Sequence, residues 1–196
     1  MALTASTMVD LGSSAPEFAL PNVAGGTATL SSSRGSTGTL VAFLCRHCPY
    51  VRHIEREIAG LAADAASRGI SFVAIGSNDA DAYPDDAPDS LRTYASELGW
   101  TFPFLHDPTQ AVAKAYGAGC TPDFFLFDAR DRLFYRGQLD ASRPGNKIPV
   151  TGSDLRFAME RLFRKETPPS DQRPSMGCNI KWKPGNEPAY FQKRSR

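Results

Sequence analysis

The feature that most constrains this chain is a pair of cysteines, Cys45 and Cys48, placed between two contrasting segments. Residues 40–44 (Leu-Val-Ala-Phe-Leu) form an unbroken apolar run, which is typical of a strand buried on both faces. From 49 to 67 the apolar residues recur at helical spacing, and Pro49 suits the first turn of a helix. The pattern predicts a buried strand that ends at Cys-Arg-His-Cys and a helix that begins there.

The rest of the chain alternates strands and helices. We expect a hairpin-like entry over 12–30, with a turn at Gly25-Gly26, and an acidic, solvated surface loop over 78–89. Further strands are predicted over 70–75, 102–105, 124–127 and 133–135, and helices over 89–98, 108–116 and 154–165. This order predicts an α/β fold with a central mixed β-sheet flanked by helices, whose first crossover is a right-handed βαβ unit.

The last part of the chain differs in composition. We expect one domain over 1–166, followed by a Pro-rich extension over 167–196 without regular structure. The extension also contains apolar residues, which a fully disordered tail would lack. They are Met176, Ile180, Trp182, Tyr190 and Phe191. We therefore expect part of the extension to pack on the domain.

Composition limits the classes of function. The chain has 196 residues, 41% hydrophobic and 22% charged, and a net charge of +1, so it fits an ordinary globular protein without a general attraction to nucleic acid or acidic membranes. It shows no apolar stretch of membrane-spanning length and no secretory signal, so we expect a cytoplasmic protein. Structural disulfides are rare in the cytoplasm, and four cysteines there indicate catalysis or metal binding.

The cysteine pair favours redox chemistry. Unpaired amides at a helix N-terminus stabilise a thiolate, and Arg46 and His47 would add positive charge. We expect Cys45 to be exposed and to act as the nucleophile, and Cys48, shielded by the helix turn, to act as the resolving thiol. The alternative is a zinc site completed from other ligands, namely Cys120, Cys178, His47 and His53. No second closely spaced ligand pair exists, so we predict no metal and no cofactor.

Four segments of the sequence resemble a known family. Residues 12–20, 40–50 and 120–128 are similar to the thioredoxin superfamily, and specifically to the peroxiredoxin-like group of the alkyl hydroperoxide reductase/thiol-specific antioxidant (redoxin) family. Residues 173–182 resemble the C-terminal signature of that group. The resemblance implies a thioredoxin-like fold in which Pro122 is a cis-proline facing the two cysteines. It also implies that Thr121 offers its backbone groups to an incoming polypeptide or thiol.

Departures from the family help to choose the activity. Peroxiredoxins carry Pro-x-x-x-Thr/Ser-x-x-Cys, and if Cys48 holds the last place, then Cys45 replaces the hydroxyl residue and Val41 replaces the proline. Pro122 stands in place of a later arginine. These losses favour disulfide exchange over direct peroxide reduction. Thr39 stands where thioredoxins carry a buried acid, so the proton acceptor must come from elsewhere.

The sequence thus predicts a thiol–disulfide oxidoreductase that serves antioxidant or redox maintenance. Its expected partners are protein or small-molecule disulfides and a recycling thiol reductant, without nucleic acid or membrane. The first alternative is a peroxidase that reduces hydroperoxides through Cys48, and the second is a zinc-binding module without enzymatic activity. Cys120 and Cys178 are candidates for an additional resolving thiol, or are inert cysteines, with Cys120 buried and Cys178 in a mobile tail.

Overall fold

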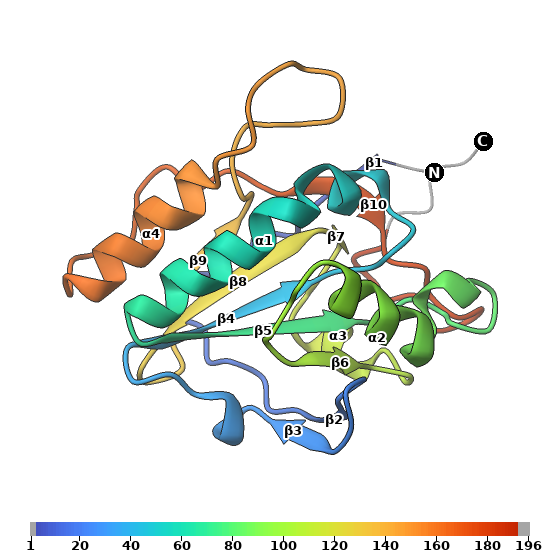
Figure 1. Cartoon of the computed structure of the whole chain (residues 1–196). Helices are drawn as coiled ribbons and strands as arrows, with labels where there is room; N and C mark the ends of the chain where they lie inside the picture. Colours follow the sequence, from blue (N-terminus) through green and yellow to red (C-terminus); the bar gives the residue numbers. More distant parts are fainter. Residues whose placement is uncertain (1–2, 192–196) are drawn as a thin grey trace.

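A five-stranded mixed sheet forms the centre of the computed structural model, which describes residues 3–191 (Figure 1). The elements follow in the order β1 (Leu3–Ala5), β2 (Ala19–Pro21), β3 (Thr27–Thr29), β4 (Gly38–Phe43), α1 (Pro49–Ser67), β5 (Ile70–Gly76), α2 (Pro88–Glu97), β6 (Phe104–His106), α3 (Ala111–Ala115), β7 (Cys120–Thr121), β8 (Asp123–Asp128), β9 (Leu133–Gly137), α4 (Ser153–Phe163) and β10 (Met176–Asn179). Short 3-10 turns occur at Ser31–Ser33 and Pro84–Asp86.

The central sheet has the strand order β6-β5-β4-β8-β9. Strand β4 lies in the middle, parallel to β5 and antiparallel to β8, and all six of its residues are buried. The continuous apolar run in the sequence reflects this burial on both faces. The thioredoxin-like fold and the mixed sheet flanked by helices are therefore confirmed.

The two faces of the sheet build two cores. On β4, Leu40 and Ala42 pack with α1, α2 and α4, whereas Val41 and Phe43 pack with α3 and the β2–β3 hairpin. Alternate side chains of a strand point to opposite faces, which explains the division. Figure 1 shows α1 and α4 crossing the same face of the sheet. The N-terminus of α1 is thereby held at the end of the central strand.

A second, smaller sheet corrects the prediction for the C-terminal extension. Strand β10 lies between β1 and β7 and is antiparallel to both (Figure 1). Residues 167–196 were expected to lack regular structure because the segment is rich in proline, and Met-Gly-Cys-Asn itself has no β-branched residue that would indicate a strand. The strand forms because partners far away in the sequence supply its hydrogen bonds. Ile180 and Trp182, which follow it, are buried, and residues 192–196 lie outside the described residues.

The helices agree with the predicted periodicity apart from their ends. Helices α1 and α4 match their predicted spans closely, whereas α3 is shorter than the predicted 108–116. Within the described residues no helix has both the length and the apolar character required to span a bilayer.

Candidate active site

The two cysteines of the Cys-Arg-His-Cys motif lie where β4 passes into α1. Cys45 comes two residues after the end of β4, and Cys48 is the N-cap residue of α1, with Pro49 in the first turn. The Cys48 sulfur lies near the first-turn amide of Val51 without completing a capping hydrogen bond, and it also contacts groups outside the helix. The first turn of α1 contains no acidic residue that would oppose a thiolate.

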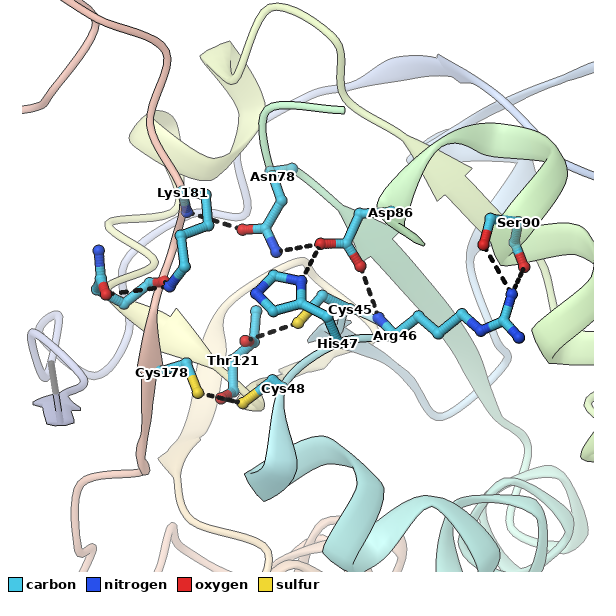
Figure 2. Close-up of polar contacts among 12 residues, drawn as sticks. Cys45, Arg46, His47, Cys48, Asn78, Asp86, Ser90, Thr121, Cys178 and Lys181 are labelled. Carbon is cyan, nitrogen blue, oxygen red and sulfur yellow. Dashed lines mark hydrogen bonds and ion pairs between the residues drawn. The ribbon is translucent and has the colours of Figure 1, made fainter. Parts of the chain in front are cut away.

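Thr121 brings the two sulfurs together from the opposite side. The Thr121-Pro122 peptide bond is cis, as the resemblance implied. The hydroxyl Oγ1 of Thr121 lies 3.1 Å from Sγ of Cys45, and the carbonyl oxygen of Thr121 lies 3.2 Å from Sγ of Cys48 (Figure 2). Because β8 pairs with β4 up to Asp123 opposite Phe43, this loop is fixed beside the motif.

A third sulfur belongs to the same cluster. Sγ of Cys178 lies 2.7 Å from Sγ of Cys48 (Figure 2). Cys178 was expected in a mobile tail, and this expectation is wrong: the residue belongs to β10, opposite Thr121 in the strand register. The pairing of β10 with β7 places its side chain at the motif.

All three sulfurs are buried. The exposed fractions of Cys45, Cys48 and Cys178 are 1%, 0% and 3%. The expectation of an exposed Cys45 is therefore wrong, because the Thr121 loop and the segment around Asp86 cover it. Burial also raises the pKa of the Cys45 thiol well above its ordinary value, and the neighbouring Cys48 and the charge of Asp86 raise it further.

Cys48 is the sulfur that favours the thiolate. Hydrogen bonds from the thiols of Cys178 and Cys45 lower the pKa of Cys48, and the amide of Val51 in α1 contributes, against the effect of burial. In exchange, the pKa of Cys178 is raised, first by its hydrogen bond to Cys48 and then by burial. Of the three sulfurs, the one at the helix N-terminus, Cys48, is the one whose pKa is lowered.

Asp86 fixes the two residues between the cysteines. Its carboxylate accepts hydrogen bonds from the amide of Arg46 at 2.7 Å and from Nδ2 of Asn78 at 2.8 Å, and its Oδ2 lies 2.5 Å from Nδ1 of His47 (Figure 2). Burial raises the pKa of Asp86, but the hydrogen bonds from His47 and Asn78 outweigh it, so the net pKa is below its ordinary value. The prediction of a solvated acidic loop over 78–89 is wrong at Asn78, Asp79 and Asp86, which are all buried.

Arg46 and His47 do not supply the positive charge that the sequence suggested. The guanidinium of Arg46 donates to Oγ of Ser90 at 2.7 Å and lies 5.8 Å from the centre of the Tyr94 ring. His47 stacks on Tyr83, and its Nδ1 lies 2.5 Å from Oδ2 of Asp86. Arg46 and His47 instead bind neighbouring residues of the loop, and the pKa of Cys48 is lowered mainly by its hydrogen bonds with Cys178 and Cys45.

The ligands of the alternative zinc site, Cys120 and His53 among them, are not gathered at one point. The sulfur of Cys120 faces the carbonyl oxygens of Pro122 at 3.6 Å and Ser175 at 3.9 Å, and burial raises its pKa well above the ordinary value. In the described part of the chain, a different group has its ligand atoms within 4.8 Å of one another: Cys45, His47 and Asp86. The carboxylate of this group already accepts hydrogen bonds from Arg46 and Asn78.

A small surface pocket adjoins the Pro122 loop. Its lining includes Tyr50 and Ile54 of α1, Pro122, and Met176 of β10. His53 also lines the pocket, and its Nε2 lies at hydrogen-bonding distance, 2.7 Å, from Oγ of Ser142. The pocket reaches the loop that holds the sulfurs, but the cysteines themselves do not line it.

Sequence reasoning missed Asp86 and Asn78. A positional signal existed for Asn78, because residues after the carboxyl ends of the adjacent parallel strands β4 and β5 meet at one edge of the sheet. No comparable signal marks Asp86, since its acidic neighbours Asp85 and Asp89 are exposed. Lys181, whose amide donates to Oδ1 of Asn78 at 2.8 Å, connects this network to the C-terminal extension.

Comparisons with known proteins agree with this geometry. The model of the AhpC/TSA family matches residues 11–136. The thiol-disulfide oxidoreductase ResA of Geobacillus kaustophilus is 30% identical over 128 residues, which cover 64% of this chain and 67% of ResA. A crystal structure of an uncharacterized conserved protein from Geobacillus kaustophilus has 49% identity and a TM-score of 0.93, covering 94% of this chain and 98% of that one. Peroxidoxin BcpB from Mycobacterium tuberculosis, at 17% identity, shares the fold with a TM-score of 0.59, over 79% and 96% of the two chains.

Proposed function

The chain belongs to the AhpC/TSA family and is an oxidoreductase, and from this premise we propose that Cys45 and Cys48 form a reversible disulfide that exchanges with substrate disulfides. One observation carries the proposal: both sulfurs approach Thr121, at 3.1 and 3.2 Å, at the N-terminus of a helix and beside a cis-proline loop. A helix N-terminus lowers the cost of forming a thiolate there.

The proton in this scheme moves between the two cysteines. The Cys45 thiol gives its proton to the Cys48 thiolate, with which it shares a hydrogen bond, and attacks one substrate sulfur. A Cys45–substrate bond forms, the substrate disulfide breaks, and the departing thiolate takes the proton from Cys48. The Cys48 thiolate then attacks Sγ of Cys45 and releases the second half of the substrate as a thiolate, which takes a proton from solvent. The protein is oxidised by two electrons, and the substrate disulfide becomes two thiols.

The burial of the sulfurs favours small substrates. Cys45 is 1% exposed, so a folded protein reaches it only after the covering segments open, whereas a small disulfide needs less space. We place the protein in the cytoplasm, where a thiol reductant would return the pair to the reduced state.

Turnover of oxidised glutathione by single-cysteine variants tests the proposal. We expect Cys45→Ser to abolish turnover, and Cys48→Ser to accumulate a mixed disulfide with glutathione on Cys45, visible by mass spectrometry. Cys120→Ser is the matched control, because the sulfur of Cys120 faces only backbone carbonyls. Undiminished turnover in Cys45→Ser would reject the assignment of the nucleophile.

A peroxidase acting through Cys48 is the second candidate, and the charge distribution favours it. Cys48 carries the lowered pKa, and hydrogen peroxide needs less space than a disulfide to reach its buried sulfur. This candidate predicts a sulfenic acid on Cys48 when both Cys45 and Cys178 are replaced by Ser, trapped with dimedone. A stopped-flow titration in which the reduced protein reacts no faster than a free thiol would dismiss it.

A further inference from the structure

Strand β10 is built to bring Cys178 against the motif. In the strand register Cys178 lies opposite Thr121 on one side and opposite Leu3 on the other. The neighbouring Gly177 makes the approach possible, because a Cβ at this position would lie 2.1 Å from the carbonyl oxygen of Thr121 and 2.7 Å from its carbonyl carbon. A residue with a side chain would push β10 away from the loop that precedes Pro122.

This approach leaves Cys178 closer to Cys48 than a packing contact requires. The two Sγ atoms are 2.7 Å apart, and a disulfide needs about 2.05 Å, so a movement of less than about 1 Å separates contact from bond. By contrast, Cys120, which occupies the neighbouring strand β7 and is equally buried, directs its sulfur at backbone carbonyls. Of these two buried cysteines, Cys178 is therefore the one whose sulfur contacts Cys48.

We propose that Cys178 is a second resolving thiol, which replaces Cys45 as the disulfide partner of Cys48. We call this transfer of the disulfide along three sulfurs the relay. The inference rests on the proposed function, since the Cys45–Cys48 disulfide formed by a substrate is its starting point. The Cys178 thiolate attacks Sγ of Cys48, the Cys48–Cys178 bond forms, and the Cys45–Cys48 bond breaks. Its electron pair goes to Cys45, which takes up the proton lost by Cys178. No net oxidation occurs in this step.

The relay has a consequence for turnover. Cys45 returns to its thiol form, and the protein remains oxidised through the buried Cys48–Cys178 disulfide. The same thiol that meets the substrate is then free again before any reductant arrives. The oxidised protein holds β10 covalently to the N-terminus of α1, beside the pocket next to Pro122.

Disulfide mapping of the full-length protein tests the relay. Trypsin cuts after Arg46, Arg52, Lys114 and Lys181 but not between Arg173 and Pro174, so the four cysteines fall on separate peptides. These are 35–46 with Cys45, 47–52 with Cys48, 115–130 with Cys120 and 166–181 with Cys178. The reduced protein is oxidised with one equivalent of diamide, blocked with N-ethylmaleimide and digested without reduction.

We expect a linked pair of peptides 47–52 and 166–181 in the wild type, retained in Cys45→Ser and Cys120→Ser and lost in Cys178→Ser. Cys178→Ser should instead stop at the link between 35–46 and 47–52. The relay is overturned if the wild type shows only that second link and alkylated Cys178. If neither link forms and all three thiols are alkylated, the proposed Cys45–Cys48 chemistry fails as well, so the two failures are distinguishable. The wild-type result does not depend on any variant folding.

Discussion

At the scale of single residues, Asp86 connects the motif to the rest of the molecule. Its folded pKa is below the ordinary value, so its contribution to stability is present above its unfolded pKa, about 3.9, and is lost as the pH falls through the folded pKa. We expect Asp86→Asn to cost about 1–3 kcal/mol at pH 7, because buried donors of His47 and Asn78 lose a charged acceptor. Urea unfolding between pH 7 and pH 2 measures this.

Comparing the unfolding free energies of the wild type and Asp86→Asn at several pH values separates the effect of the Asp86 charge from the effect of its packing. Below the folded pKa the wild-type carboxyl is neutral, like the amide of the variant, so the difference between the two stabilities should shrink with acidification. A difference that stays constant from pH 7 to pH 2 would show that the Asp86 charge contributes nothing.

Two residues that flank Cys45 should move its pKa in opposite directions. The negative charge of Asp86 raises the pKa of Cys45, whereas the hydrogen bond from Thr121 lowers it. Asp86→Asn should therefore speed alkylation of Cys45 at pH 8, and Thr121→Val should slow it by about two- to tenfold, the effect of one hydrogen bond of about 0.5–1.5 kcal/mol. Iodoacetamide labelling of peptide 35–46, followed by mass spectrometry, measures both. Shifts of the same sign would contradict the electrostatic account.

At the scale of elements, the packing of β10 depends on the absence of a side chain at Gly177. Gly177→Ala places a methyl group against backbone atoms of Thr121, which cannot move aside as a side chain can. We expect a loss of about 1–3 kcal/mol in urea unfolding, together with loss of the disulfide-linked peptides that contain Cys48 and Cys178. Both effects have one cause, the displacement of β10.

Gly60 provides the matched control. It lies inside α1, where the nearest atom to an added Cβ is Nη2 of Arg156 at 3.7 Å. Gly60→Ala should stabilise the protein by about 0.5–1 kcal/mol, because glycine is a poor helix former, and should leave the disulfide pattern unchanged. Equal behaviour of the two variants would argue against the close approach at Gly177.

The helices and strands differ in how well the sequence predicts them. Helix α1 and strand β4 were predictable because their apolar patterns arise from burial within the element itself. Strands β1 and β10 were not, since each has four residues or fewer and is stabilised by partners far along the chain. Leu3 pairs with Cys178, and no local sequence pattern can predict a pairing between residues so far apart along the chain.

At the scale of the whole molecule, the site residues also fall into two groups: those that a local pattern or the family resemblance predicts, and those that only tertiary contacts bring to the site. The Cys45–Cys48 motif and the cis-proline loop were predicted, the first from local pattern and the second from family resemblance. Cys178 and Asp86 became part of the site only through tertiary contacts, one through β10 and the other through the loop after β5. Buried polar groups in a loop look like solvated ones in the sequence, because both require the same residue types.

From the position of the C-terminal extension we predict that residues 1–166 do not fold stably without it. Strand β10 is the middle strand of its sheet, and Ile180 and Trp182 belong to the core on the α3 face. Burying large apolar side chains contributes about 1.5–3 kcal/mol each, and a whole domain has only about 5–15 kcal/mol of stability. A chain ending at residue 166 should therefore lose most of its cooperative unfolding transition, measured by circular dichroism during heating. Ile180→Ala in the full chain, which should cost about 2–5 kcal/mol and keep a single transition, isolates one buried contact from the removal of β10. If the shortened chain melts as cooperatively as the full one, the second sheet is an accessory to the fold, and the Cys48–Cys178 contact requires another explanation.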